Sequence, residues 1–122
     1  MSADARQQLG EYGEGVAREA LRRRGYEILD RRVRLRGGEI DIVARDGDVV
    51  VFVEVKTRAG AAFGGASAAV TPLKQRRLTA LATAYLAHRR WIDRPCRFDV
   101  VTVEVVHGRE RVLVYPQAFD AC

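Results

Sequence analysis

The segment GEIDIVARDGDVVVFVEVKTR, residues 38–58, constrains the fold most, because it reads as two strands joined by a tight turn. Asp46 and Gly47 form an Asp-Gly pair between apolar runs, which is a strong signal for a β-hairpin. We place the turn at this pair, with Arg45 facing Asp48 across it. This choice fixes the predicted register of the two strands.

The predicted register brings two carboxylates and a lysine to one face of the hairpin. Asp41 lies opposite Phe52 and Glu39 lies opposite Glu54, and paired residues point to the same side of a sheet. Lys56 joins them because strand side chains alternate with a period of two. Asp41 and Glu54 are then diagonal neighbours, with Cα atoms roughly 7–8 Å apart. Charge is costly inside a sheet, so this group predicts a metal-dependent phosphodiesterase site, that is, a nuclease.

The other face of the hairpin is apolar and β-branched, and we expect it to pack on a helix. It carries Ile40, Ile42, Val49, Val51, Val53 and Val55. The alternative for the charged face is a solvated polar surface with incidental ion pairs, which is common in antiparallel sheets. The run VVVFV argues against that alternative, because strands this apolar tend to be central.

The composition indicates one globular domain over residues 1–122. The chain is 48% hydrophobic and 30% charged, which is not typical of a disordered chain. No apolar run approaches the length of a membrane span and the first ten residues are polar, so we expect neither export nor membrane insertion. Cys96 and Cys122 have no spacing typical of a metal or redox site. A cytoplasmic location is the simplest expectation.

The charge distribution favours nucleic acid as the partner. The net charge is +5 and the pI is about 9.8, so a basic surface would attract phosphates while the acidic group holds cations. Only Lys56 and Lys74 are lysine among 21 basic residues, which favours a specific role for the compact ammonium of Lys56. The residues expected to bind nucleic acid are Arg31, Arg32, Arg34 and Arg36 before the hairpin, together with Arg58 and Lys74.

The predicted elements follow the order αβββαββ, which gives an α/β three-layer sandwich with a mixed central sheet flanked by helices. Between the central elements lies a loop rich in small residues, whose Phe63 either pins the loop to the core or stacks on a base. The expected ranges are a helix Ala5–Arg24, a strand Tyr26–Val33, a hairpin Glu39–Thr57, a helix from Thr71 and Pro72 to Arg90, and a hairpin of Arg97–Val106 and Arg111–Tyr115 that turns at His107-Gly108.

The sequence pattern alone predicts no chemical role for three further acidic residues. Glu14 borders the apolar stripe of the first helix and reads as a solvated glutamate, although the glycines around it allow a close approach of backbone or substrate. Asp99 and Glu104 point to opposite faces of the fourth strand and read as plain edge charges.

The hairpin motif resembles the signature of a known nuclease fold. Asp41 followed by Glu54-Val55-Lys56 is similar to the D…(D/E)xK pattern of restriction-endonuclease-like enzymes. More narrowly, GEID at 38–41 and FVEVKTR at 52–58 resemble the YraN family of bacterial proteins, whose fold is similar to archaeal Holliday-junction resolvases. The resemblance extends over about residues 10–116. Further matching features are Gly13-Glu14 with Ala17, Phe63-Gly64, Lys74 and Arg97-Phe98-Asp99.

This resemblance implies roles for the site residues. Asp41 and Glu54 would be ligands of Mg²⁺ or Mn²⁺ together with the Val55 carbonyl, Lys56 would be the catalytic lysine, and Glu14 becomes a candidate fourth acid. The reaction would be hydrolysis of phosphodiester bonds in DNA, with junction-like DNA as a candidate substrate. Junction resolvases need two active sites, so the analogy also implies a homodimer. The family often has an asparagine before GEID, whereas this chain contains none.

Two readings compete with an enzyme. In the first, the chain is a catalytically weak or inactive nucleic-acid-binding module on a nuclease fold. In the second, it is a subunit that docks on a DNA-processing complex. The fold analogy alone does not separate them, because one fold hosts many functions. An enzyme requires the metal for its activity, whereas a binding module does not.

Overall fold

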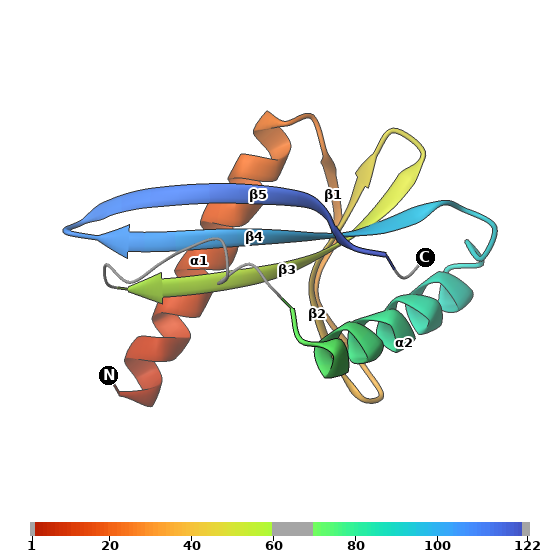
Figure 1. Cartoon of the computed structure of the whole chain (residues 1–122), viewed down its shortest axis with the longest axis horizontal. Helices are drawn as coiled ribbons and strands as arrows, with labels where there is room; N and C mark the ends of the chain where they lie inside the picture. Colours follow the sequence, from red (N-terminus) through yellow and green to blue (C-terminus); the bar gives the residue numbers. More distant parts are fainter. Residues whose placement is uncertain (1, 60–69, 121–122) are drawn as a thin grey trace.

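Five strands form one mixed sheet with a helix packed on each face (Figure 1). The structure is a computed structural model and describes residues 2–59 and 70–120, so the predicted loop residue Phe63 lies outside the described residues. The elements are α1 (Ala3–Arg23), β1 (Glu27–Leu35), β2 (Gly38–Asp46), β3 (Val49–Ala59), α2 (Pro72–His88), β4 (Cys96–Val106) and β5 (Arg109–Phe119). The α/β class and the element order αβββαββ are confirmed.

The strands lie in the sheet in chain order, from β1 to β5. The pair β3–β4 is parallel, and the other three pairs are antiparallel. The parallel pair is connected through α2, as a parallel connection requires a long crossover. The predicted second hairpin is confirmed, with its turn at His107 and Gly108, which both have positive φ.

Local sequence signals set the ends of α1. The Ser2 hydroxyl accepts a hydrogen bond from the Ala5 N–H at 3.1 Å and caps the first turn. Gly25 has a φ of +88°, and its N–H donates to the Arg22 carbonyl at 2.9 Å. Glycine adopts this left-handed conformation without the usual steric cost. The predicted helix stop at Gly25 is therefore confirmed.

The second helix begins as predicted, but its buried face differs from the predicted one. The Thr71 hydroxyl accepts from the Lys74 N–H at 3.2 Å, and Pro72 follows in the first turn. From the apolar positions of this segment we expect Leu73, Leu78, Leu81, Ala84 and Tyr85 to face the core, yet Leu73 is 52% exposed and Ala84 is also exposed. At about 100° per residue, Leu73 lies roughly 140° around the helix from Leu78. The buried set is Leu78, Leu81, Ala82, Tyr85 and Leu86.

The sheet has an apolar cluster on each face, so β3 is buried on both sides. On the α2 side, Phe52 packs edge-on against Tyr85, with ring centroids 5.8 Å apart. On the α1 side, the expected packing of Ile42, Val51 and Val53 against the helix is confirmed. Ile40 was predicted to share that side, but it belongs to the cluster on the α2 side.

The first hairpin forms as predicted, but its register is shifted by two residues. Asp46 pairs with Val49, and Val43 rather than Asp41 pairs with Phe52. The prediction of Arg45 facing Asp48 is therefore wrong. Gly47, with a φ of +59°, occupies the first central position of a two-residue turn, where a type II′ turn places glycine. A shift of two preserves the side-chain alternation among the paired residues, but Asp41 lies beyond the last pair, Ile42 with Val53.

Candidate active site

The candidate site lies where β2 separates from β3. Ladder pairing between these strands ends at Ile42 and Val53. Arg32, on the neighbouring β1, has a φ of +48°, an uncommon conformation for a residue other than glycine. Beyond this point the first hairpin turns toward α2, so Ile40 packs on the α2 side while Ile42 packs on the α1 side. This change of side is why the predicted position of Ile40 is wrong.

Asp41 occupies the fork between the two strands. Its Oδ2 accepts a hydrogen bond from the Val55 N–H at 2.8 Å, so a carboxylate takes the place of the missing ladder partner. This contact holds Asp41 beside the Glu54-Val55-Lys56 segment. The Val55 contact runs through its N–H, and the predicted use of its carbonyl as a metal ligand stays a prediction.

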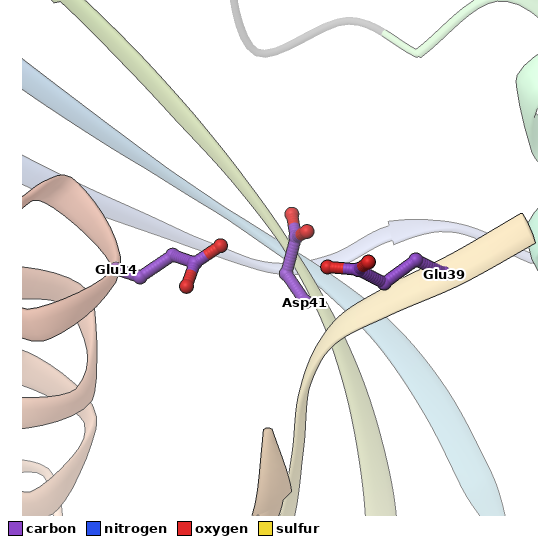
Figure 2. Close-up of side chains that lie close together, drawn as sticks. All are labelled: Glu14, Glu39 and Asp41. Carbon is purple, nitrogen blue, oxygen red and sulfur yellow. The ribbon is translucent and has the colours of Figure 1, made fainter. Parts of the chain in front are cut away.

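Three carboxylates meet at this fork (Figure 2). Glu14 of α1 and Glu39 of β2 point toward Asp41, and one oxygen of each lies within 4.8 Å of the other two. Glu14 is therefore close to the hairpin acids, as the resemblance implied. Glu39 was not among the predicted site residues, although the alternation in GEID placed it on the same face as Asp41.

Gly13 permits the approach of α1 that places Glu14. A Cβ atom at Gly13 would lie 1.8 Å from Thr57 Oγ1 and 2.7 Å from Thr57 Cβ, so a larger residue does not fit here without displacement. The close backbone approach expected around Glu14 is thus confirmed at this glycine. The carboxylate of the next residue in α1 is thereby brought to the sheet.

Basic side chains contact the acids of the site. Arg32 Nε lies 2.7 Å from a Glu14 oxygen, and Arg34 Nε lies 3.4 Å from a Glu39 oxygen. Lys74 Nζ lies 2.8 Å from Glu54 Oε1. Three of the residues predicted to bind nucleic acid therefore neutralise acids in this structure.

The site disfavours an additional negative charge. Burial raises the pKa of Asp41 to about 7, and the Glu54 charge adds to this rise, while the Val55 N–H and Lys74 oppose it. Burial also lowers the pKa of Lys56, against the opposing charge of Glu54, and the nearby Lys74 and Arg58 lower it further. Perturbed carboxylates and lysines of this kind concentrate at functional sites.

The ligand atoms available at this fork fit a hard divalent cation. All three clustered groups offer carboxylate oxygens, which Mg²⁺ and Mn²⁺ prefer. Glu54 is only 9% exposed, so the Lys74 ammonium compensates a carboxylate that is largely removed from water. A bound cation would relieve the repulsion among these acids.

The sequence comparisons assign the family. The model of the uncharacterised protein family UPF0102 matches residues 13–103, which contain every acid of the site and Lys56. The chain belongs to the UPF0102 family. The resemblance to YraN proteins expected from the GEID and FVEVKTR motifs is thus confirmed.

Curated UPF0102 proteins are similar to this chain over nearly its whole length. One from Symbiobacterium thermophilum is 53% identical over 114 residues, or 93% of this chain and 97% of the relative. One from Anaeromyxobacter dehalogenans is 48% identical over 117 residues, or 96% and 87% of the two chains. One from Geobacter metallireducens is 46% identical over 112 residues, or 92% of each chain.

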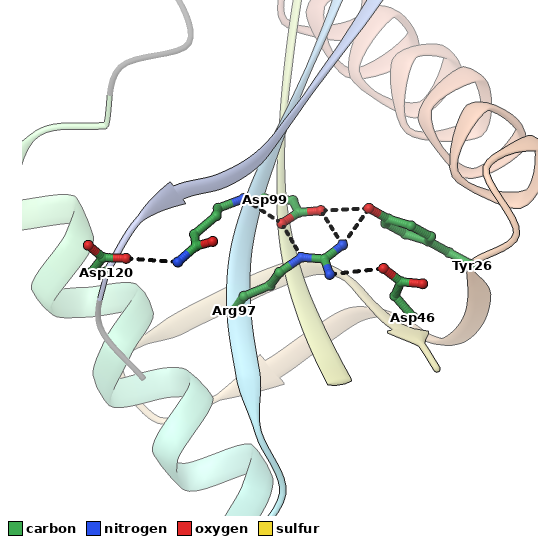
Figure 3. Close-up of polar contacts among 6 residues, drawn as sticks. Tyr26, Asp46, Arg97, Asp99 and Asp120 are labelled. Atoms are coloured by element: carbon green, nitrogen blue, oxygen red, sulfur yellow. Dashed lines mark hydrogen bonds and ion pairs between the residues drawn. The ribbon is translucent and has the colours of Figure 1, made fainter. Parts of the chain in front are cut away.

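A second polar cluster of this UPF0102 protein lies at the other end of β2 (Figure 3). Arg97 donates from Nε to Asp99 at 3.0 Å, from Nη1 to Asp46 at 2.9 Å and from Nη2 to the Tyr26 hydroxyl. The Gln117 N–H also donates to Asp99, at 3.0 Å. These residues come from β2, β4, β5 and the segment before β1, so the cluster joins elements of the fold.

Asp99 and Glu104 are not edge charges, because β4 lies between β3 and β5. They are 1% and 7% exposed. The prediction failed because the position of β4 inside the sheet, and the contacts of Asp99 with Tyr26 and Gln117, join segments that are distant in sequence. The hydrogen bonds between Asp99 and Arg97 raise the pKa of that guanidinium, and Asp46 acts in the same direction.

The remaining predicted nucleic-acid contacts are exposed. Arg36 lies in the β1–β2 turn, and Arg58 lies near the end of β3. Arg31 pairs with Ile42 in the sheet and so faces α1. Within the described ranges of this UPF0102 chain, neither helix has the length and apolar character needed to cross a membrane.

Proposed function

We propose that this protein is a metal-dependent endonuclease that hydrolyses phosphodiester bonds in DNA. The observation that carries the proposal is the cluster of Glu14, Glu39 and Asp41, held at a fork of the sheet by the N–H of Val55, the residue between Glu54 and Lys56. Carboxylates of two elements converge there, and a lysine lies two residues from Glu54 on the same strand. Such a group offers both a cation site and a cationic side chain for a phosphate.

Glu14, Glu39 and Asp41 would hold Mg²⁺ or Mn²⁺, with the Asp41 carboxylate fixed in place by the Val55 N–H. When bound, such a cation supplies positive charge at the phosphate and lowers the pKa of water. Glu14 and Glu39 each keep an arginine close by, and these guanidiniums are available to phosphate oxygens when a cation neutralises the acids. Arg32 and Arg34 would then contact the acids before the cation binds and the phosphate afterwards.

Lys56 would act on the phosphate rather than on the cation. Its lowered pKa brings the ammonium closer to the range in which it exchanges a proton. As an ammonium it would balance the charge that develops on the phosphorus centre and orient the attacking water. A compact, rotatable donor suits this position better than the rigid fork of arginine.

The test is cleavage of labelled linear, flapped and four-way-junction DNA under titration with Mg²⁺ and Mn²⁺. We expect metal-dependent cuts by the wild type, and at least a 100-fold loss in Asp41→Asn and Lys56→Ala, as for removal of a group that stabilises the transition state. Asp48→Asn, an exposed turn residue of the same hairpin, is the matched control and should cleave normally. The substrate that is cut fastest identifies the preferred DNA structure.

The opposite result supports a binding module on a nuclease fold. That result is an absence of cuts with either metal, together with salt-sensitive DNA binding that survives Asp41→Asn. Cleavage that persists unchanged in Lys56→Ala would remove the proposed role of that lysine.

A further inference from the structure

A pocket between α1 and β1 carries three arginines on the side of the sheet that faces α1. Arg18 and Arg22 lie on the helix, and Arg31 lies on the strand. The open pocket has a volume of about 370 Å³. Its other lining residues are Ile28, Leu29 and Asp30.

The three guanidiniums form no ion pair within residues 2–59 and 70–120. Asp30 is the one acid in the pocket lining, but its Oδ2 accepts from the Tyr85 hydroxyl at 3.4 Å and lies 3.5 Å from Arg89 Nη2. Both partners belong to the α2 side, so the carboxylate of Asp30 is engaged away from the arginines.

The clustering of like charges in this pocket has an electrostatic cost. Arg18 and Arg22 are separated by four residues in α1, a spacing at which like charges destabilise a helix. Burial lowers the pKa of Arg18, and the charges of Arg31 and Arg22 lower it further, against the opposing charge of Glu14. A group of cations with this arrangement is suited to an anion that bridges them.

The pocket is adjacent to the acid cluster. Glu14, Arg18 and Arg22 follow each other along α1 at intervals of four residues, about 6 Å each along the helix axis. Arg31 precedes Arg32, whose guanidinium contacts Glu14. The pocket thus lies next to Glu14 along the helix. Its arginines differ from Arg32 and Arg34, which contact the acids directly.

We propose that Arg18, Arg22 and Arg31 form a phosphate-binding subsite for the DNA strand whose scissile bond lies at the acid cluster. This inference rests on the proposed nuclease function and deepens it, because it states where the strand is held. A backbone phosphate in the pocket accepts hydrogen bonds from two or three guanidiniums, while its neighbour along the strand reaches the acids. The arginines thereby position the strand and read no sequence.

The test measures binding of labelled duplex and four-way-junction DNA by fluorescence anisotropy in EDTA, over a series of KCl concentrations. We expect Arg18→Gln/Arg31→Gln to raise Kd about tenfold or more at roughly 0.1 M salt, and to reduce the slope of log Kd against log[KCl] by about 2. Arg22→Gln alone, at an exposed position, should weaken binding several-fold and reduce the slope by about 1. The single variant guards against a folding defect in the double variant.

Arg76→Gln/Arg90→Gln is the matched control, because it removes the same charge from exposed positions on and after α2. We expect its Kd to change less than about threefold. Equal weakening in both double variants would assign the effect to net charge and overturn the subsite, as would unchanged binding in Arg18→Gln/Arg31→Gln or no DNA binding by the wild type. If the wild type binds DNA through the pocket but never cleaves it, the subsite stands and the nuclease function fails.

Discussion

At the scale of single residues, the proton affinity of Asp41 is the feature with the clearest chemical consequence. Its pKa of about 7 results mainly from burial and from Glu54, so the metal-free site holds a proton on this carboxylate under mildly acidic conditions. A cation and a proton therefore compete for the same oxygens. Metal affinity at the proposed site should rise with pH until Asp41 is fully ionised.

The stability of the metal-free protein should also depend on Asp41. In the unfolded chain this carboxyl titrates near its ordinary pKa of 3.8, and in the folded protein it titrates near 7. Between these values the folded state binds more protons, so the free energy of unfolding falls as pH rises, by about 4 kcal/mol from this group. Urea denaturation in EDTA at several pH values between 4 and 8 measures this decline.

Two variants identify the source of the pH effect. Asp41→Asn should lack this part of the decline, while the exposed-turn variant Asp48→Asn should keep the profile of the wild type. Parallel profiles for the wild type and Asp41→Asn would contradict a raised pKa at this carboxyl.

At the scale of elements, the contact between α1 and β3 determines the geometry of the site. Gly13 lies directly against Thr57, and Glu14 follows it in the helix. The packing of α1 on β3 and the position of the Glu14 carboxylate therefore depend on two adjacent residues of α1. A change that moves α1 outward by even a small distance separates Glu14 from Asp41.

Two alanine substitutions in α1 should have opposite effects on stability. Gly13→Ala places a methyl group 1.8 Å from Thr57 Oγ1 and should cost about 1–3 kcal/mol or more through overpacking. Gly10→Ala meets no atom within 4 Å and should stabilise the helix by about 0.5–1 kcal/mol. Urea denaturation compares the two variants with the wild type. A stabilised Gly13→Ala protein would contradict the close approach of α1 to β3.

The elements of the site were predictable from sequence because their signals are local. The turn residues predicted the hairpin, which brings Asp41 beside the Glu54-Val55-Lys56 segment, where its carboxylate accepts from the Val55 N–H. The fork was not predictable, because the positive φ of Arg32 and the separation of β2 from β3 follow from tertiary packing. Glu39 was overlooked for the same reason.

At the scale of the whole molecule, the two polar clusters lie at opposite ends of β2 and differ in kind. The acids of the site come from α1 and β2, and they face cations that a metal is expected to replace. The cluster around Arg97 instead pairs one guanidinium with Asp46 and with the fully buried side chain of Asp99. We therefore expect the Arg97 cluster to contribute stability, whereas the proposed chemistry belongs to the acid cluster.

Removal of Arg97 should destabilise the fold and leave DNA binding intact. Arg97→Met leaves the Asp99 carboxylate buried without its cation and should cost about 3–5 kcal/mol. Arg45→Met removes an exposed pair with Glu27 and should cost at most about 1 kcal/mol. Denaturation curves measure both costs. A loss of stability no larger in Arg97→Met than in Arg45→Met would show that the buried cluster does not hold the elements together.

The bond between Asp41 and Val55 has a consequence for the interpretation of mutants. The carboxylate links β2 and β3 as well as being a candidate ligand, since it accepts a hydrogen bond from the Val55 N–H beyond the last pair of these two strands. An alanine at position 41 would leave this donor unpaired, at a cost of about 1–3 kcal/mol, and would loosen the fork itself. Asparagine retains an oxygen that accepts the bond. A lost activity in the asparagine variant can therefore be ascribed to the missing charge, whereas the same loss in an alanine variant has two causes.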